Sequence, residues 1–128
     1  MSGFVLDHTA LAALGRGHRL MSQLVDAAHR ETDRHLYAPA LCLAAAVAER
    51  PPLADHAGAL PAVEVVDLGY PSATAVGRLV AAGVDWRAAQ AVDAGRPTLD
   101  WPAGRPVVAA VPDPLRRIGP ALDIEELP

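Results

Sequence analysis

The sequence predicts one α/β domain over residues 1–128, built as a three-layer α/β/α fold with a mostly parallel central sheet. Ala- and Leu-rich segments alternate with short Val-rich segments, as in folds where helices connect parallel strands. A chain of 128 residues is a normal length for one domain and can bury a core without disulfides or metal. Because 52% of residues are hydrophobic and only 4% are aromatic, Ala, Val and Leu must form that core.

Four segments have the apolar runs that are typical of buried strands. The first is short and covers residues 4–6 (FVL). The second is dense in Val and covers residues 62–68 (AVEVVDL). Residues 105–111 (RPVVAAV) and 121–127 (ALDIEEL) supply the third and fourth.

Three helices are predicted between the first two strands. Residues 9–14 form the first, which the following glycines end. Residues 18–31 form the second, where apolar side chains at spacings of three and four predict a buried face. That face consists of Leu20, Leu24, Ala27 and Ala28. The polar residues 30–35 end this helix, and Pro39 begins a third, almost wholly apolar helix that ends before Pro51.

Helices and loops also alternate in the second half of the chain. Asp85 stands at an N-cap position and Gly95 at the C-terminus of one predicted helix. The other segments are a helical turn or loop over 53–60, a helix from Pro71 to Gly83, a Pro-rich loop over 96–104, and a short turn or helix over 112–119.

Charge and cysteine content exclude several classes of protein. A net charge of −4 argues against a broad electrostatic nucleic-acid binder, which is usually basic. Cys42 is the single cysteine, so we expect no disulfide and no cysteine metal site, and a small buried side chain at this position. No signal peptide and no membrane-spanning run is visible, so we expect a cytoplasmic protein without a membrane partner.

Three aspartates stand where parallel α/β sheets bind ligands, at or near the carboxyl ends of strands. Asp7 follows the first strand, Asp85 begins a helix, and Asp113 follows the third strand by two residues. If they converge, a hard cation such as Mg²⁺ is their natural partner. Each also has a structural alternative: Asp7 and Asp85 can simply cap helices, and Asp113 lies between two prolines as a turn residue.

The order of these segments resembles a PIN domain, the family of metal-dependent nucleases that includes the VapC-type ribonuclease toxins of bacterial toxin–antitoxin pairs. In "VLDHTALAAL", Asp7 and Thr9 take the places of the Asp and the Ser or Thr of the first motif. "YAPALCLAAAVAE" resembles the second motif, and "GVDWRAAQAV", with Asp85, resembles the third. "RPVVAAVPDPLRRI" and "LDIEEL" resemble the fourth motif and the closing strand, so the resemblance spans nearly the whole chain.

The sequence departs from the PIN pattern at two of its four acids. Ala45 stands where the second motif usually carries Glu. Ala109 and Val111 stand where the fourth motif carries Thr and an acid, and Asp113 comes two residues late. The implied acidic site is therefore incomplete, and we describe it as degenerate.

The resemblance implies catalytic roles for Asp7, Thr9 and Asp85, and a Mg²⁺ or Mn²⁺ ion held by Asp7, Asp85 and Asp113. In the family such an ion activates a water that attacks RNA. Mg²⁺ needs only one or two carboxylates when waters complete its shell, so Asp7 and Asp85 keep a reduced site open. Two hypotheses follow: a ribonuclease with weak or absent activity, or a catalytically silent PIN-like module that binds a protein or nucleic acid.

The resemblance also implies partners, namely a second copy of the chain in a homodimer, a small antitoxin protein, and RNA. The apolar helix over residues 39–48 is consistent with burial in a core or in a dimer interface. His8 is expected to pack at the end of the first strand rather than to bind a phosphate or a metal. Trp86 is expected to pack, and Trp101, in the Pro-rich loop, to be available for an interface.

Overall fold

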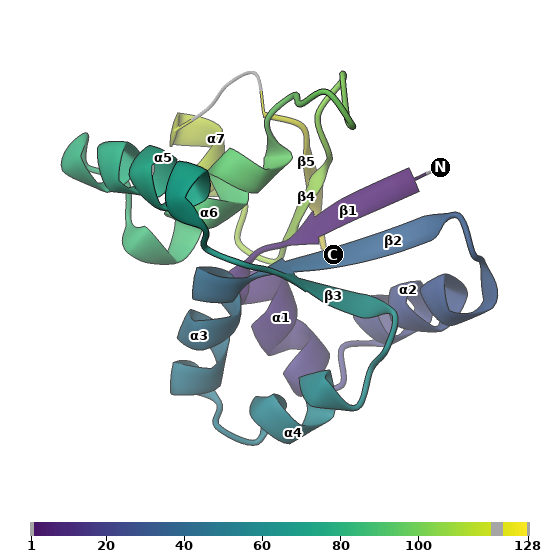
Figure 1. Cartoon of the computed structure of the whole chain (residues 1–128). Helices are drawn as coiled ribbons and strands as arrows, with labels where there is room; N and C mark the ends of the chain where they lie inside the picture. Colours follow the sequence, from purple (N-terminus) through teal and green to yellow (C-terminus); the bar gives the residue numbers. More distant parts are fainter. Residues whose placement is uncertain (1, 119–121, 128) are drawn as a thin grey trace.

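The computed structural model describes residues 2–118 and 122–127 and confirms the α/β/α architecture. Its sheet has five strands in the order β3-β2-β1-β4-β5, and every neighbouring pair is parallel (Figure 1). The strands are β1 (Ser2–Leu6), β2 (Arg34–Pro39), β3 (Val63–Val66), β4 (Val107–Ala109) and β5 (Ile124–Glu126). Gly119 and Ala121, at the ends of two predicted segments, lie outside the described residues.

Helices cover both faces of this sheet. Figure 1 shows one group of helices below the sheet and a second group above it. The lower group is α1 (His8–Gly15), α2 (Arg19–Arg30), α3 (Ala40–Glu49) and α4 (Leu53–Gly58). The upper group is α5 (Tyr70–Ala81), α6 (Trp86–Gly95) and α7 (Asp113–Ile118). Among the described residues, no helix is both long and apolar enough to cross a membrane.

Strand β2 lies in a stretch that the sequence pattern did not predict to be a strand. The prediction of a polar loop over residues 30–35 was wrong, because β2 begins at Arg34 and ends at Pro39. The apolar helix predicted after it is present as α3, for which Pro39 is the N-cap. Leu36 and Ala38 are buried on one face of this strand. The alternation that marks a half-buried strand was hidden by charged residues at one end and by proline at the other.

Helix α2 buries a face that matches the predicted one only in part, since Ala28 is buried and Leu24 packs against the core as predicted. Met21, Val25 and Ala28 are buried, whereas Leu20 is 42% exposed. The buried residues recur at helical spacing just as the predicted set does, so periodicity alone left the rotation of the helix open. Packing of α2 against β2, which the sequence did not predict, selects the face with Met21 and Val25.

The core is built from small aliphatic side chains, as the composition predicted. The central strand β1 contributes Val5 and Leu6, and β4 contributes Val107 and Val108. Alanines of α1, α3 and α6 let these helices lie close to the sheet and to one another. The close packing of α1, α3 and α6 brings the first residues of α1 and α6 together with the second half of α3, and the candidate site lies where they meet.

Candidate functional site

Asp7 is buried at the turn between β1 and α1, with 2% of its surface exposed. Its Oδ1 accepts hydrogen bonds from the Thr9 hydroxyl (2.7 Å) and from the backbone N–H of Ala10 (2.9 Å). Asp7 is therefore the N-cap of α1, as the structural alternative proposed. Burial raises the pKa of its carboxyl, while the hydrogen bonds from Thr9 and Ala10 and the nearby His8 oppose that shift.

Thr9 joins the start of α1 to the end of β4. Its hydroxyl donates to Asp7 and accepts from the backbone N–H groups of Ala110 (2.9 Å) and Val111 (3.3 Å). The hydroxyl is thus fully engaged in holding two neighbouring strand ends together. The partners lie 101 and 102 residues apart in sequence, so local spacing gave no signal of this contact.

Asp85 caps α6, and Arg87 binds both of its carboxylate oxygens. Oδ1 accepts from the backbone N–H of Arg87 (2.9 Å) and from its Nε (3.1 Å), and Oδ2 accepts from its Nη2 (2.7 Å). These hydrogen bonds hold the pKa of Asp85 at about 2, well below its usual value. The sequence predicted the cap at Asp85 but did not identify Arg87 as the group that neutralises it.

Asp113 begins α7 on the surface of the protein. Its carboxylate accepts from Arg116 (3.2 Å), which also pairs with Glu126 (3.1 Å). Over residues 2–118 and 122–127, no three His, Cys, Asp or Glu side chains form a group that could hold a metal ion. Asp7, Asp85 and Asp113 are accordingly not brought together into one ligand cluster.

A cavity of about 430 Å³ lies beside Trp86 and Arg87, and one of its lining residues is Ala45, where the resemblance led us to expect Glu. It is lined by His8, Ala45, Ala48, Glu49, Trp86 and Arg87. The side chain of Ala45 is a methyl group, so it contributes no metal ligand to this cavity. The buried Nδ1 of His8 has no hydrogen-bond partner among the described residues, and the imidazole lies near enough to Asp7 and Asp85 to lower both of their pKa values.

Comparison with protein-family models and with curated protein sequences finds no match. The structure, in contrast, is similar to that of VapBC2 from Rickettsia felis, which was solved bound to a DNA fragment from their promoter. The TM-score is 0.65 at 13% sequence identity, over 98% of this chain and 99% of that chain. This chain has a PIN-like fold. At this level of identity the likeness concerns the fold alone.

Within the PIN-like fold, the two tryptophans exchange their predicted roles. Trp86 is 46% exposed at the rim of the candidate site, so the prediction that it packs was wrong. Trp101 instead meets the ring of Tyr37 edge-on, with ring centroids 6.1 Å apart. Gly3 makes this packing possible, because a Cβ at that position would lie 2.7 Å from the Trp101 ring.

Cys42 lies behind the candidate site of the PIN-like domain. It is fully buried, as predicted, and its thiol donates to the backbone carbonyl of Arg87 at 3.4 Å. Burial, together with the negative charge of Asp7, raises the pKa of the thiol to about 12. Cys42 is therefore a structural residue that links α3 to the first turn of α6.

Gln90 is a polar residue of this region that the sequence reading missed. It is 1% exposed, and its Oε1 accepts from the backbone N–H of Leu41 (2.8 Å) while its Nε2 donates to the carbonyl of Val66 (3.1 Å). The Gln90 side chain of α6 thus forms hydrogen bonds with backbone groups at the start of α3 and at the end of β3. The available signal was a single Gln among the alanines of residues 88–91, a buried segment of α6 that has no other polar side chain.

Proposed function

We propose that this chain is a PIN-like domain related to the ribonucleases of toxin–antitoxin systems, with weak or absent nuclease activity and a function in binding a partner. The observation that supports this most strongly is that the carboxylate of Asp85 is already bound by a guanidinium group. Both of its carboxylate oxygens are bound by Arg87, and Ala45 lines the adjoining cavity where the family pattern has Glu.

The residues present do not fit the divalent ion that the family uses. Asp7 is buried, and the upward shift of its pKa means that its surroundings disfavour the ionised form that Mg²⁺ or Mn²⁺ requires. Asp85 already has a cationic partner in Arg87, and Asp113 pairs with Arg116. No cleavage step through a metal therefore follows from this arrangement of side chains.

A protein partner is the second part of the proposal. Several large apolar side chains between residues 68 and 86 are exposed, and we place the partner's contact on them. They are Leu68 (37%), Tyr70 (84%), Val80 (42%) and Trp86 (46%). The similar structure of VapBC2 comes from a complex bound to DNA, which supports a small antitoxin-like protein as one partner. The homodimer and RNA binding implied by the resemblance remain proposals beside it.

Calorimetry with Mn²⁺ and an RNA cleavage assay with Mg²⁺ test the catalytic part. We expect no metal-binding heat and no cleavage by the wild-type chain. A double variant, Ala45→Glu with Arg87→Ala, restores an acid and releases Asp85, and should gain Mn²⁺ binding. Mg²⁺-dependent cleavage by the wild-type chain that disappears in Asp7→Asn and in Asp85→Asn would establish an active ribonuclease and overturn the proposal.

Co-expression with the product of a short neighbouring reading frame, where one is present, tests the partner. We expect the two proteins to purify together, and Tyr70→Ser with Val80→Ser to weaken the complex because the substitutions remove exposed apolar surface. The matched control is Ala59→Ser, an exposed position after α4. Equal recovery of the partner with all three proteins would contradict this placement of the interface.

A further inference from the structure

An apolar cavity of about 390 Å³ lies between β3 and the helices α3 and α4. Val63 and Val65 line it on the strand side, and Leu43, Val47 and Ala57 line it on the helix side. Among the described residues, none of those that line it has a charged or polar side chain. Such walls favour apolar side chains and give a small polar ligand no side-chain hydrogen bonds. None of these residues lines the cavity of the candidate site.

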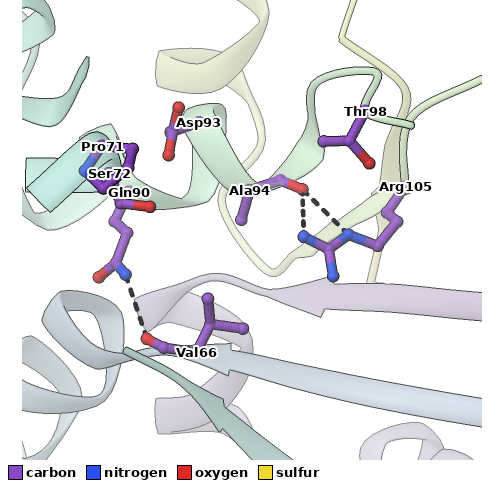
Figure 2. Close-up of a pocket in the computed structure, with 8 residues that line it drawn as sticks. All are labelled: Val66, Pro71, Ser72, Gln90, Asp93, Ala94, Thr98 and Arg105. Carbon is purple, nitrogen blue, oxygen red and sulfur yellow. Dashed lines mark hydrogen bonds between the residues drawn. The ribbon is translucent and has the colours of Figure 1, made fainter. Parts of the chain in front are cut away.

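Strand β3 forms an edge of the sheet, and its outer side is open. Among the described residues it pairs only with β2, and Figure 1 shows it as the lowest strand, above α4. Its outer backbone N–H and C=O groups therefore have no strand partner, and Val65 beside them is 52% exposed. The carbonyl of Val66 accepts a hydrogen bond from Gln90 of α6 (Figure 2), which holds the end of the strand in place. The edge is therefore a fixed template on which another strand can pair.

The two edges of the sheet differ in the side chains that they present. On β5, the adjacent residues Glu125 and Glu126 are both exposed, and charged side chains of this kind protect an edge from pairing. On β3, Val63 and Val65 alternate with Glu64, so the two valines face the cavity and the glutamate faces the other side of the sheet. The β3 edge thus combines free backbone groups with an apolar cavity for alternate side chains of an added strand.

The charges beside the cavity indicate the chemistry of its partner. Residues 49–67 include four acids, Glu49, Asp55, Glu64 and Asp67, but only one Lys or Arg, which is Arg50. All five side chains are exposed, and each acid lies within two residues of one that lines the cavity. A second copy of the chain paired at this edge would bring the same excess of negative charge, whereas a basic segment would be attracted.

We propose that β3 and this cavity bind an extended basic segment of a partner protein, which joins the sheet as an additional strand. Its backbone pairs with the outer side of β3, and its alternate apolar side chains lie against Val63 and Val65 in the cavity. Lys or Arg side chains at the intervening positions face Glu64, whose ion-pair partner within the described residues is His35, at 3.9 Å. The inference goes beyond the proposed function, because its residues belong neither to the candidate site nor to the exposed set that begins at Leu68.

Titration calorimetry of the full chain with a synthetic peptide tests the proposal. The probe is acetyl-KVKVKVK-amide, in which the valines can face the cavity while the lysines face Glu64. We expect this peptide to bind, and acetyl-EVEVEVE-amide to bind about tenfold more weakly or worse because its charge is reversed. Absence of binding heat for the basic peptide at millimolar concentration would overturn the proposal, and so would equal affinity for the acidic one.

A third peptide separates strand pairing from charge attraction alone. It is the basic probe N-methylated at its central valine and at the next lysine, so it keeps every side chain and every charge. Because successive N–H groups of a strand point to opposite sides, one of the two blocked groups faces β3 in any register. We expect its affinity to fall about tenfold or more, and an affinity equal to that of the unmodified probe would refute the added strand.

Variants of the chain locate the binding surface. Val65→Lys should weaken binding of the basic probe about tenfold or more, whereas Leu99→Lys, which adds the same charge at a fully exposed apolar residue outside the cavity, should leave it unchanged. Thermal unfolding checks that Val65→Lys is folded. Glu64→Gln removes only a charge and should weaken binding about threefold, with Glu125→Gln on β5 as its control. Unchanged affinity in Val65→Lys and Glu64→Gln would refute the site, and self-association of the wild type that Val65→Lys abolishes would show that a second copy occupies the edge instead.

Discussion

Asp7 and Asp85 both cap a helix, yet their surroundings shift their pKa values in opposite directions. Burial at the end of β1 raises the pKa of Asp7, whereas hydrogen bonds from Arg87 lower that of Asp85 to about 2. The two shifts have structural causes, namely desolvation for one carboxyl and an adjacent guanidinium for the other. Perturbed pKa values at this site therefore report helix capping and ion pairing as much as any retained catalytic role.

The buried carboxyl of Asp7 makes the stability of the protein depend on pH. Because its folded pKa is raised above 3.8, the folded state keeps the proton to higher pH than the unfolded chain does. The free energy of unfolding of the wild type, relative to Asp7→Asn, should therefore fall as pH rises above about 3.8. Urea unfolding at a series of pH values measures this difference. A difference that rises with pH would contradict the prediction.

The Asp85 carboxyl should titrate at about pH 2 when followed by carbon NMR. In Arg87→Gln the titration should move up toward 3.8, because the guanidinium hydrogen bonds are lost. Any stability that the pair contributes is present above pH 3.8 and is lost as pH falls through about 2. Arg117→Gln, which removes an exposed cation on α7, is the control. An unchanged titration in Arg87→Gln would show that Arg87 is not the cause of the shift.

Among the secondary-structure elements, those with clear end signals were predictable from sequence. Helix α6 begins after its cap at Asp85 and ends at Gly95, as predicted, because both signals act within one turn of the chain. Strand β2 was missed because its identity depends on β1 and β3, which pair with it on both sides. The buried face of α2 in turn depends on its packing against β2. The error in the α2 face therefore follows from the failure to predict β2.

Gln90 connects three of these elements, and its loss should be costly. Gln90→Met keeps the length of the side chain but leaves the backbone N–H of Leu41 without its acceptor. A buried donor without a partner costs about 1–3 kcal/mol, so the free energy of unfolding should fall by that amount. Urea unfolding measures the loss, and hydrogen exchange at the Leu41 amide localises it. Gln23→Met, at an exposed position of α2, should change stability by less than about 0.5 kcal/mol.

Gly104 shapes the loop that positions Arg105, and a side chain there should destabilise the protein. Its φ is +76°, and an added Cβ would lie 2.5 Å from the carbonyl oxygen of Gly95. Gly104→Ala should therefore cost at least about 1 kcal/mol in thermal unfolding. Gly77→Ala, in the open middle of α5, should instead stabilise by about 0.5–1 kcal/mol. Equal effects of the two substitutions would contradict the strained position of Gly104.

At the scale of the whole molecule, the sequence predicted the fold class, an α/β/α domain with a mostly parallel sheet. It did not predict the contacts that form the candidate site. The first motif placed Asp7 at a strand end because strand, cap and helix follow one another directly. The bonds that complete the region join Thr9 to Ala110 and Leu41 to Gln90, 101 and 49 residues apart. Such pairs are set by how the elements pack, which a single sequence does not specify. Asp113 is a further example, because its position in the sequence did not reveal that its carboxylate pairs with Arg116.

The resemblance predicts a homodimer, and we place its contact on the same exposed apolar side chains of α5, so that a second copy of the chain and the antitoxin-like partner compete for this surface. Sedimentation should show a species of two 13.3 kDa chains at high concentration. Val80→Glu should shift the protein toward the single chain, because a carboxylate in an apolar contact loses its hydration. Ala59→Glu, which adds the same charge at an exposed position after α4, is the control. A single chain at every concentration would contradict the prediction.

The buried thiol of Cys42 gives the protein a built-in reporter of local opening. Because it is the only cysteine, a thiol reagent has one target, and that target is closed off between α3 and the first turn of α6. A thiol with a pKa of about 12 is almost entirely protonated at neutral pH, so the folded state should be inert to labelling. The labelling rate therefore measures how often α3 and α6 separate. A partner that clamps these helices together would slow the labelling without any change elsewhere in the chain.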